Sequence, residues 1–519
     1  MFIKRTHHAS PVFKTETSML KRFALAPVAA LLLSTLANAQ ATQPASESQP
    51  GESTPPRLTI EQCVAMALDK NFDLRIQRID TESAVNTLEI ARAEYDPSFS
   101  ANANRSYSRS DLYGAGNASG THETDASVSV SQKIITGATL QLGYAASRRD
   151  YSGPSSSTPV FDPAWGSGLT LRVTQPLLKN FGSTVNKATI ERARLSIDRS
   201  NYDLKSTVLS TIRSVEDAYY NLDFVRARLE VRKFSLEVAQ KLLEENKMRR
   251  QVGTATNLDV LQAEVGVATA QRDIIVAQKA VNDAEDALLS LINPFQFEAA
   301  IGPLAVSKID DVSVSFARSY KLARDNSPSL ASTRLAIKQS EIDLAVAKRN
   351  RLPQLDLVGA AGYDATRGTF GRAFNQTLSQ DDHDWSVGAT LTYPWGRRRE
   401  RANLANAKAS LDSLQVGYEQ LDQNVLVQVR TAVRSVQTSD EGVRITTLAT
   451  KLSEQQYELE KARYDQGLST FRRVQEAKED YDTARLAEID ARVNLRLALA
   501  ELARLETTSL NRYNVQLGE

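Results

Sequence analysis

The chain contains 519 residues, and its 63 basic and 62 acidic side chains give a formal net charge of +1. This balance argues against a nucleic-acid partner, which would need a basic surface. The four histidines and one cysteine do not form a cluster with metal-ligand spacing, so we expect no metal site. The sequence also lacks a phosphate-binding loop and a nucleophile–base arrangement, and we therefore expect no cofactor and no enzyme activity.

Residues 1–39 have the pattern of a secretory signal peptide. The basic pair Lys21-Arg22 precedes an apolar run over 23–36, and small residues over 37–39 form a cleavage site. The run is shorter than the ~20 residues that span a bilayer as a helix. We therefore expect cleavage rather than retention as a membrane anchor.

Residues 40–56 are rich in Ser, Gln, Pro and Glu and predict a disordered lead-in. The residues before Met19 fit a signal peptide poorly, which makes Met19 an alternative to Met1 as the initiator. After the signal, no apolar run is long enough for a transmembrane helix. An exported chain of this kind is periplasmic, secreted, or inserted in an outer membrane as a β-barrel.

The remainder of the chain is a duplication. One set of residues recurs at an offset of 256 (353 − 97) and a second set at an offset of 214 (467 − 253). The first set pairs Ala67, Asp69, Leu74, Leu88, Ala91 and Pro97 with Ala323, Asp325, Leu330, Leu344, Ala347 and Pro353; the second pairs Gly253, Thr256, Val260, Ala263, Ala270, Ala277 and Leu288 with Gly467, Thr470, Val474, Ala477, Ala484, Ala491 and Leu502. Constant offsets indicate two copies of one structural unit. We predict a first repeat over 57–294, an equatorial linker over 295–314, a second repeat over 315–506 and a C-terminal tail over 507–519.

Each repeat predicts a helix, a β segment, a very long helix and a shorter helix. The predicted helices cover 58–94, 184–251 and up to about 291 in the first repeat, and 315–349, 398–465 and up to about 505 in the second. A helix of ~68 residues is roughly 100 Å long, and two helices of ~37 residues laid end to end match that length. We therefore expect each repeat to form a double-layered helical rod.

The last helix of each repeat has an apolar heptad seam, which predicts coiled-coil packing. The seam contains Val260, Ala263, Val267, Ala270, Ile274, Ala277, Val281, Ala284, Leu288 and Leu291, and then Val474, Ala477, Tyr481, Ala484, Glu488, Ala491, Leu495, Ala498, Leu502 and Leu505. Only Glu488 interrupts it. An ordinary α-helical rod would explain the seam equally well, so the seam alone does not identify a class of protein.

The β segments are more informative because apolar and small or polar residues alternate along them. Six strands are predicted: 98–108, 126–134, 138–147, 168–175, 354–363 and 385–393. Strands of this length with aromatic residues at their ends suit a water-filled membrane barrel. A half-buried soluble sheet also alternates, but nothing in this chain could cover such a sheet.

The connections between strands favour the membrane interpretation. The turn around Thr136-Gly137 is tight, whereas the loops over 109–125, 148–167 and 364–384 are long and polar. Short turns on one side and long loops on the other are typical of outer-membrane barrels. Six strands would leave open edges in lipid, which is not tolerated. Several chains are therefore expected to close one barrel together.

At this level the chain resembles the TolC-like outer membrane efflux proteins, over residues 57–506. The resemblance rests on the duplicated unit, on Tyr95-Asp96-Pro97 and Arg351-Leu352-Pro353, on the segment 252–264 (VGTATNLDVLQAE) and on the segment 388–396 (GATLTYPWG). It implies a mixed fold, an all-α coiled coil plus a transmembrane β-barrel, assembled as a trimeric α-barrel/β-barrel channel. It also implies a periplasmic adaptor protein, an inner-membrane pump of the RND or ABC type, and outer-membrane lipid as partners.

The resemblance places two turns at the periplasmic tip of such a channel. The residues that match the adaptor-contacting turns are Gly253, Thr254, Thr256, Asn257, Gly467, Ser469 and Thr470, and those that match the gate are Asp259, Tyr464, Arg473 and Glu476. The family often has two acidic residues in the second gate segment. Here Arg473 and Glu476 occupy those positions, so either a mixed Arg/Glu ring forms or Arg473 simply faces the adaptor. The implied function is an exit duct for efflux or type I secretion.

The strand count also departs from the family, which usually has four strands per chain and twelve per trimer. Six strands per chain would give eighteen, unless the additional hairpin lies outside the barrel wall. Interfacial anchors are expected at the barrel ends: Trp385, Tyr393, Trp395, Arg397 and Arg398. The acidic run 381–384 is expected to be a solvated loop rather than a cation site. The alternative to a channel is a periplasmic or surface coiled-coil scaffold, which does not explain the alternating strands.

Overall fold

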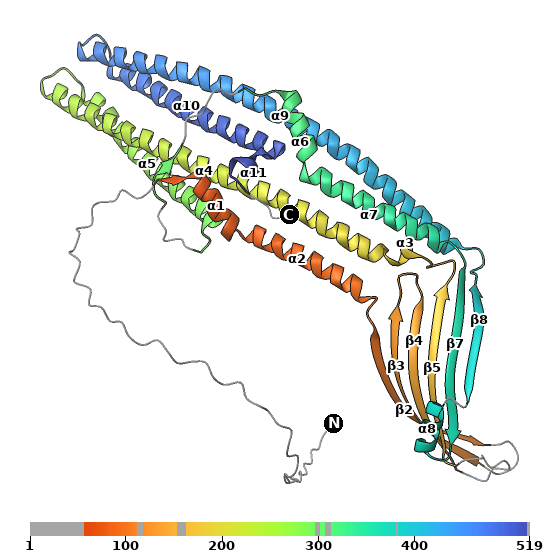
Figure 1. Ribbon diagram of the computed structural model, residues 1–519. Helices are drawn as coiled ribbons and strands as arrows, with labels where there is room; N and C mark the ends of the chain where they lie inside the picture. Colours follow the sequence, from red (N-terminus) through yellow and green to blue (C-terminus); the bar gives the residue numbers. More distant parts are fainter. Residues whose placement is uncertain are drawn as a thin grey trace, which may run out of the picture. The chain divides into compact units, whose positions relative to one another are not determined.

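A computed structural model describes residues 57–111, 118–152, 162–295, 301–306, 313–379 and 382–515 (Figure 1). The predicted signal peptide and lead-in, as well as Asp381, lie outside these residues. In the described part of the chain, no helix is both long enough and apolar enough to cross a membrane.

The first predicted helix of each repeat is divided in two, which corrects the continuous helices expected over 58–94 and 315–349. The pieces are α1 (Ile60–Lys70) and α2 (Phe72–Ala93), and α6 (Phe316–Asn326) and α7 (Pro328–Asn350). At the first break the Asn71 side chain accepts hydrogen bonds from the backbone N–H groups of Asp73 and Leu74, at 2.9 and 3.3 Å, and so caps α2. At the second break Ser327 caps α7, and Pro328 occupies its first turn.

Two long helices form the frame of the helical region. They are α4 (Ala188–Gln251), preceded by the short α3 (Ser183–Asn186), and α9 (Arg398–Asp465). Each long helix packs against two shorter ones: α2 and α5 (Asn257–Ile292) lie along α4, and α7 and α10 (Phe471–Glu506) lie along α9 (Figure 1). At 1.5 Å per residue, the 64 residues of α4 extend about 96 Å. The helix α10 also packs against α4, so the two repeats are in contact.

The largest core cluster surrounds Tyr219 in the middle of α4. Its ring is fully buried, and its hydroxyl oxygen lies 3.0 Å from the carbonyl oxygens of both Leu58 and Ala305. These carbonyls belong to a parallel pair of two-residue strands, β1 (Leu58–Thr59) and β6 (Leu304–Ala305). Cys63 is buried in the same cluster, and burial raises the pKa of its thiol to about 12. The cysteine is therefore a small core group.

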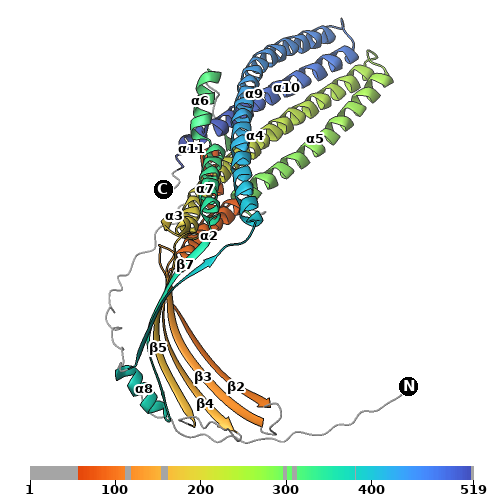
Figure 2. The same cartoon turned by 90° about the vertical axis from the view of Figure 1, so that its right-hand side faces the viewer.

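A six-stranded antiparallel sheet adjoins the helices, with strand order β2-β3-β4-β5-β7-β8 (Figure 2). The strands are β2 (Ser98–Asp111), β3 (Ala118–Lys133), β4 (Thr139–Ser152), β5 (Ala164–Pro176), β7 (Gln354–Arg367) and β8 (His383–Thr392). All six overlap the strands predicted from the sequence, and each runs further toward the end away from the helices, which we call the far end. In the described part of the chain, β2 and β8 each have one unpaired edge.

The two faces of the sheet differ in chemistry. Across one rung, meaning a set of register partners, the residues on one face are Phe99, Val130, Leu142, Leu171, Ala361 and Trp385. The neighbouring rung on the other face contains Ser100, Ser129, Gly143, Thr170, Gly362 and Asp384. We call these the apolar face and the polar face. Because strand side chains alternate, this division follows directly from the period-two pattern of the sequence.

The described part of the segment 364–384, which is expected to be a polar loop, has mostly regular structure instead. Strand β7 continues to Arg367, and a helix, α8 (Phe370–Ser379), follows it. The far ends of the strands carry polar residues on both faces, such as the Glu123–Arg149 pair of β3 and β4. The far ends of the strands therefore lack the apolar–polar alternation that identifies a strand, and for this reason the sequence predicts loops there.

The β3–β4 turn shows why one glycine is required. Gly137 has φ +94°, a conformation that L side chains rarely adopt. A Cβ there would come 2.6 Å from the carbonyl oxygen of Asn180. That carbonyl accepts a hydrogen bond of 2.9 Å from the Asn186 side chain, at the end of α3. The tight turn is thus held closely against the start of the helical region.

Candidate functional site

The two helical turns that the sequence singled out have closely similar backbones. Gly253 has φ +81° and Gly467 has φ +75°. After each glycine a backbone N–H bonds to a carbonyl five residues earlier: Thr254 to Arg249 and Leu468 to Arg463, both at 2.9 Å. This is the Schellman termination of a helix, and it requires a left-handed residue that glycine supplies. We call the region formed by these turns and the adjoining helix ends the helical tip.

Asp259 is bound to its own helix start. Its carboxylate accepts from the Thr256 backbone N–H at 2.8 Å and from the Thr256 hydroxyl at 2.6 Å, and the Thr256 hydroxyl in turn accepts from the Asp259 N–H. This capping box satisfies donors at the start of α5. The hydrogen bonds from Thr256 lower the pKa of Asp259. Asp259 therefore has a structural role within one chain, which is to cap the start of α5.

Tyr464 links the two repeats at the helical tip. It is 6% exposed, and its hydroxyl donates to the Asn246 side-chain oxygen at 3.1 Å. The Arg249 guanidinium lies 4.0 Å from the ring centroid and 3.5 Å from the Asp465 carboxylate. A cation at this distance over an aromatic face is attracted to it. The end of α4 is thus joined to the end of α9 through Tyr464 and Arg249.

The other two predicted gate residues lie apart from these contacts. Arg473 is exposed on the first turn of α10. The Glu476 carboxylate accepts from Arg472, at 2.8 Å, rather than from Arg473. Within one chain, the structure therefore distributes the four predicted gate residues among a helix cap, an inter-repeat contact and an exposed helix surface.

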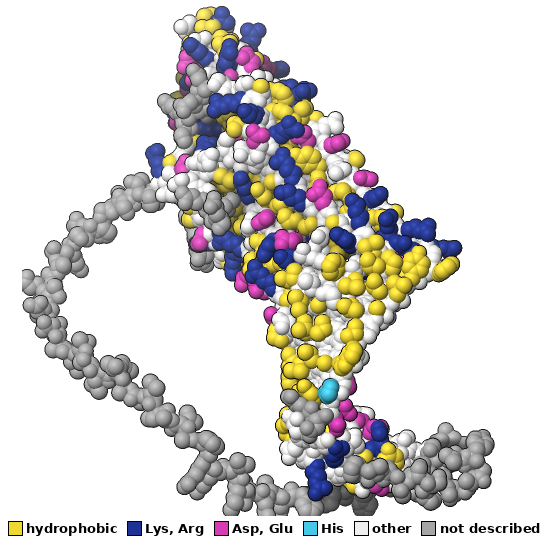
Figure 3. Space-filling model, turned by 45° about the vertical axis from the view of Figure 1, so that its right-hand side comes forward, with side chains coloured by type: hydrophobic (Ala, Val, Ile, Leu, Met, Phe, Trp, Pro, Cys, Tyr) yellow, Lys and Arg dark blue, Asp and Glu magenta, His cyan; other side chains and the backbone are white. Residues whose placement is uncertain are grey.

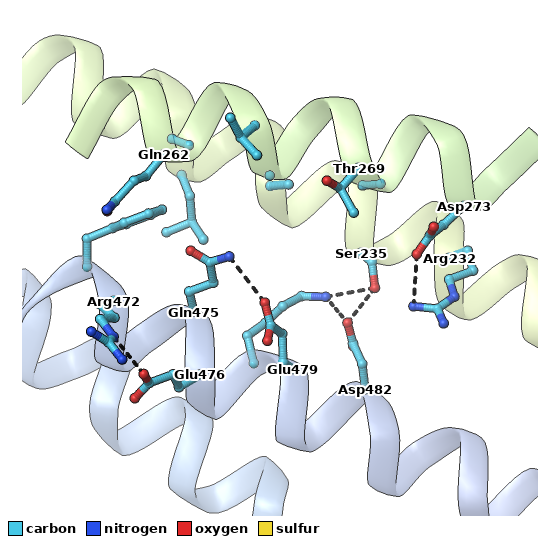
Figure 4. Close-up of a pocket in the computed structure, with 18 of the residues that line it drawn as sticks. Arg232, Ser235, Gln262, Thr269, Asp273, Arg472, Gln475, Glu476, Glu479 and Asp482 are labelled. Carbon is cyan, nitrogen blue, oxygen red and sulfur yellow. Dashed lines mark hydrogen bonds and ion pairs between the residues drawn. The ribbon is translucent and has the colours of Figure 1, made fainter. Parts of the chain in front are cut away.

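A cleft beside the helical tip contains a buried charged cluster that sequence reasoning missed (Figure 4). The cleft has a volume of about 810 Å³ and is lined by α4, α5 and α10. Lys478 and Asp482 form an ion pair on α10, and each side chain is only 9% exposed. The Lys478 ammonium also donates to the Ser235 hydroxyl on α4 at 2.7 Å. Burial lowers the pKa of Lys478.

The position of this cluster explains why the heptad analysis did not find it. The apolar heptad seam through Ala477 and Tyr481 follows one stripe of α10. Lys478 and Asp482 each come one residue after a seam position and therefore lie outside this stripe. Because α10 packs against both α9 and α4, it buries a second stripe. In the sequence, only the four-residue spacing between Lys478 and Asp482 indicates an ion pair. The same spacing is common in exposed helical pairs, so it does not predict that this pair is buried.

Removing the first-repeat cap should weaken only one of the two turns. We expect Thr256→Ala to destabilise the start of α5 by about 1 kcal/mol, because it removes the capping hydroxyl. The equivalent Thr470 makes no side-chain capping hydrogen bond, so Thr470→Ala is a matched control. Hydrogen exchange over residues 254–263 and 468–477 measures both. Equal acceleration in the two variants would contradict the assignment.

The cap also predicts a pH dependence. Because the folded pKa of Asp259 is lowered below 3.8, its contribution to stability is present above that pH and is lost as the pH falls through the lowered value. Asp259→Asn should remove this dependence from the same exchange measurement. A variant that still loses protection over the same acidic range would point to a different titrating group.

The predicted interfacial anchors divide between two levels of the sheet. Trp395 is 96% exposed just before α9, and the Arg397 guanidinium lies 5.7 Å from the Tyr393 ring centroid. Arg398 begins α9. In Figure 3 hydrophobic side chains form a band over the sheet, and basic side chains gather at the border between this band and the helical region. Trp385, by contrast, pairs with Ala361 in the interior of the apolar face, because the paired strands extend beyond it.

Long helical hairpins joined to a sheet with one apolar face are the architecture of a channel-forming class of protein. Two segments, 139–294 and 319–506, match the family model described as Outer membrane efflux protein, and they make up more than half of the chain. The chain belongs to the outer membrane efflux protein family.

Relatives and solved structures agree with this assignment. The chain is 24% identical over 452 residues to outer membrane protein OprJ of Pseudomonas aeruginosa, covering 86% of this chain and 83% of OprJ. It is 26% identical over 322 residues to the pyoverdine export outer membrane protein OpmQ of Pseudomonas putida, covering 60% and 66%. The crystal structure of a membrane protein from Pseudomonas aeruginosa has the same fold, with a TM-score of 0.65 at 21% identity, covering 86% of this chain and 93% of that one.

Membership of this family establishes the class of function and the location. The protein is an outer-membrane exit duct of an efflux system and not an enzyme. It resides in the Gram-negative outer membrane and has a periplasmic extension.

Proposed function

We propose that three copies of this chain assemble into one duct whose eighteen strands close a single barrel. The observation that carries this proposal is the pair of unpaired edges, on β2 and β8, in a sheet with one apolar face. Unpaired backbone groups are not tolerated in hydrocarbon, so the edges must meet edges of other copies. The apolar face would contact lipid, and the polar face, with its serine pairs such as Ser100–Ser129 at 2.8 Å, would line the water-filled lumen.

The helical tip would be the periplasmic entrance of the duct. Its exposed turns, with Gly253, Thr254, Asn257 and Gly467, would contact an adaptor protein that connects the duct to an inner-membrane pump. Tyr464 and Arg249 would restrain the entrance, because they tie the end of one repeat to the end of the other. Asp259, Arg473 and Glu476 would flank this restraint. A small-molecule cargo is supported by the export role in the name of the OpmQ relative.

The proposal is tested by the mass of the full mature chain in detergent and its conductance in planar bilayers. We expect a trimer with low conductance, since the tip contacts hold the entrance nearly shut. Arg249→Ala should raise the conductance, whereas Arg434→Ala, remote from the tip on α9, should not. A monomer without conductance would overturn the proposed duct. A conducting trimer whose conductance is unchanged in Arg249→Ala would reject only the role of the tip contact.

A further inference from the structure

The apolar face ends at a definite level near the far end of the sheet. Its side chains run along β7 from Leu355, which pairs with Leu391, to Ala365, which pairs with Ser167. This stretch is roughly 33 Å of strand, or about 25 Å of height at the usual tilt of a barrel strand. Outer-membrane barrels have an apolar band about 25 Å tall. The next rung therefore lies at the boundary of the hydrocarbon.

That next rung is rich in arginine. Its successive register partners on the apolar face are Arg105, Thr124, Arg148, Trp165 and Arg367, which we call the arginine rung. Neighbouring cations are about 10 Å apart, since two strand spacings separate them. The Arg148 guanidinium lies 5.3 Å from the Trp165 ring centroid. The side chains of Arg148 and Arg367 remain 44% and 34% exposed.

Among the residues that the structure describes, two carboxylates adjoin the arginine rung, fewer than its three arginines. Asp150 contacts Arg148 at 2.9 Å, and Asp382 lies 3.9 Å from Arg367. Glu123 is on the polar face, where it pairs with Arg149. The apolar face therefore ends in a row of arginines whose guanidinium groups are accessible from outside.

The helix α8 packs against the apolar face from the arginine rung down to the second rung below it. It lies on the apolar face across β5 and β7: Phe374 meets Tyr144 at 5.9 Å between ring centroids, Phe370 meets Trp165 at 5.8 Å, and Thr377 donates to the Ser167 carbonyl at 3.0 Å.

The opposite side of α8 is mostly polar, with Arg372 and Asn375 exposed beside one apolar residue, Leu378. Such groups are costly to place in hydrocarbon, so this side must lie among lipid headgroups. Arg372 adds a further cation near the arginine rung.

We propose that the arginine rung and α8 form a binding site for the phosphate groups of a phosphorylated glycolipid in the outer leaflet. The acyl chains would lie along the apolar face below the rung. Guanidinium groups recognise phosphate oxygens through paired hydrogen bonds, and tryptophan suits the boundary between hydrocarbon and headgroups. The inference rests on the proposed function in one respect, since it requires the apolar face to contact lipid.

The test is a lipid titration of the purified, delipidated full mature chain in detergent. Diphosphorylated lipid A and its dephosphorylated form are added separately, and bound lipid is measured by native mass spectrometry and by the shift in thermal unfolding. We expect the phosphorylated form to bind more tightly. The double variant Arg148→Gln with Arg367→Gln should weaken its binding by roughly tenfold or more. The matched control is Arg149→Gln with Arg172→Gln, on the polar face, which should bind as the wild type does.

The outcomes separate this inference from the proposed function. Equal binding of both lipids, or equal losses in the two double variants, would overturn the lipid site. Competition by inorganic pyrophosphate as effective as by free lipid A would show a simple anion site and would also overturn it. Wild-type trimers that conduct in bilayers without discriminating the lipids would leave the duct intact and reject only this site. A chain that neither assembles nor conducts would reject the duct itself.

Discussion

Lys478→Ala is expected to destabilise the helical tip by about 3–5 kcal/mol, because it leaves the Asp482 carboxylate buried without its cation. Asp482 already has one oxygen, Oδ1, without a hydrogen-bond partner in the described part of the chain. Its other oxygen depends on Lys478 and Ser235. Loss of the ammonium should therefore separate α10 from α4, and hydrogen exchange over residues 471–486 should accelerate strongly.

The control is an exposed pair with the same spacing and the same residue types. Lys279 and Asp283 on α5 are 2.5 Å apart, with side chains 75% and 61% exposed. Lys279→Ala should change exchange only slightly, since exposed pairs contribute little. Replacing the buried pair together, with Lys478→Met and Asp482→Leu, should restore most of the protection, because no uncompensated charge remains. If Lys478→Ala and Lys279→Ala behaved alike, the pair would not hold the helices together.

Tyr219→Ala is expected to lower the free energy of unfolding of the helical region by about 3–5 kcal/mol. The substitution empties a fully buried ring position and frees the two carbonyls of β1 and β6. We expect the earliest loss of hydrogen-exchange protection at residues 58–60 and 303–306. Chemical denaturation monitored by circular dichroism gives the global effect.

Two further variants separate the ring from its hydroxyl. Tyr219→Phe retains the packing and should cost about 1 kcal/mol, as expected for one lost hydrogen bond. Tyr202→Ala, on the same helix but 38% exposed, should cost much less than Tyr219→Ala. If Tyr202→Ala lowered the free energy of unfolding as much as Tyr219→Ala does, the loss would come from removing any aromatic ring on α4 and not from the core around Tyr219.

Much of the fold follows from local patterns in the sequence. The predicted helix over 398–465 matches α9, because long uninterrupted helical segments with a glycine stop are strongly marked. The sequence does not predict the break at Asn71, because asparagine also occurs within surface helices and caps a helix only where its own backbone leaves helical geometry, as it does here. The helix α8 was missed because its ten residues are held by contacts with β4 and β5, which are distant in the sequence.

The site was partly predictable for the same reason. The turns at Gly253 and Gly467 are local features that repeat along the chain, and both appeared as positive-φ turns. Arg249 and the Lys478–Asp482 pair depend on which helix lies beside which, and a heptad pattern describes only one neighbour at a time. The sequence predicts Trp385 at a barrel end because the predicted strand begins at 385, whereas the pairing of β7 with β5 extends the apolar face beyond this rung.

The open edges of the sheet have a consequence for biogenesis. A lone copy of this chain would expose an apolar face to water and two unpaired strand edges to any neighbour, and it would have no stable place in either periplasm or bilayer. In the duct that we propose, folding of the sheet, recruitment of the other copies and insertion would therefore occur as one coupled event. The yield of assembled duct should consequently rise steeply with the local concentration of newly exported chains. At low concentration, unassembled chains should be degraded by periplasmic proteases rather than form incomplete pores.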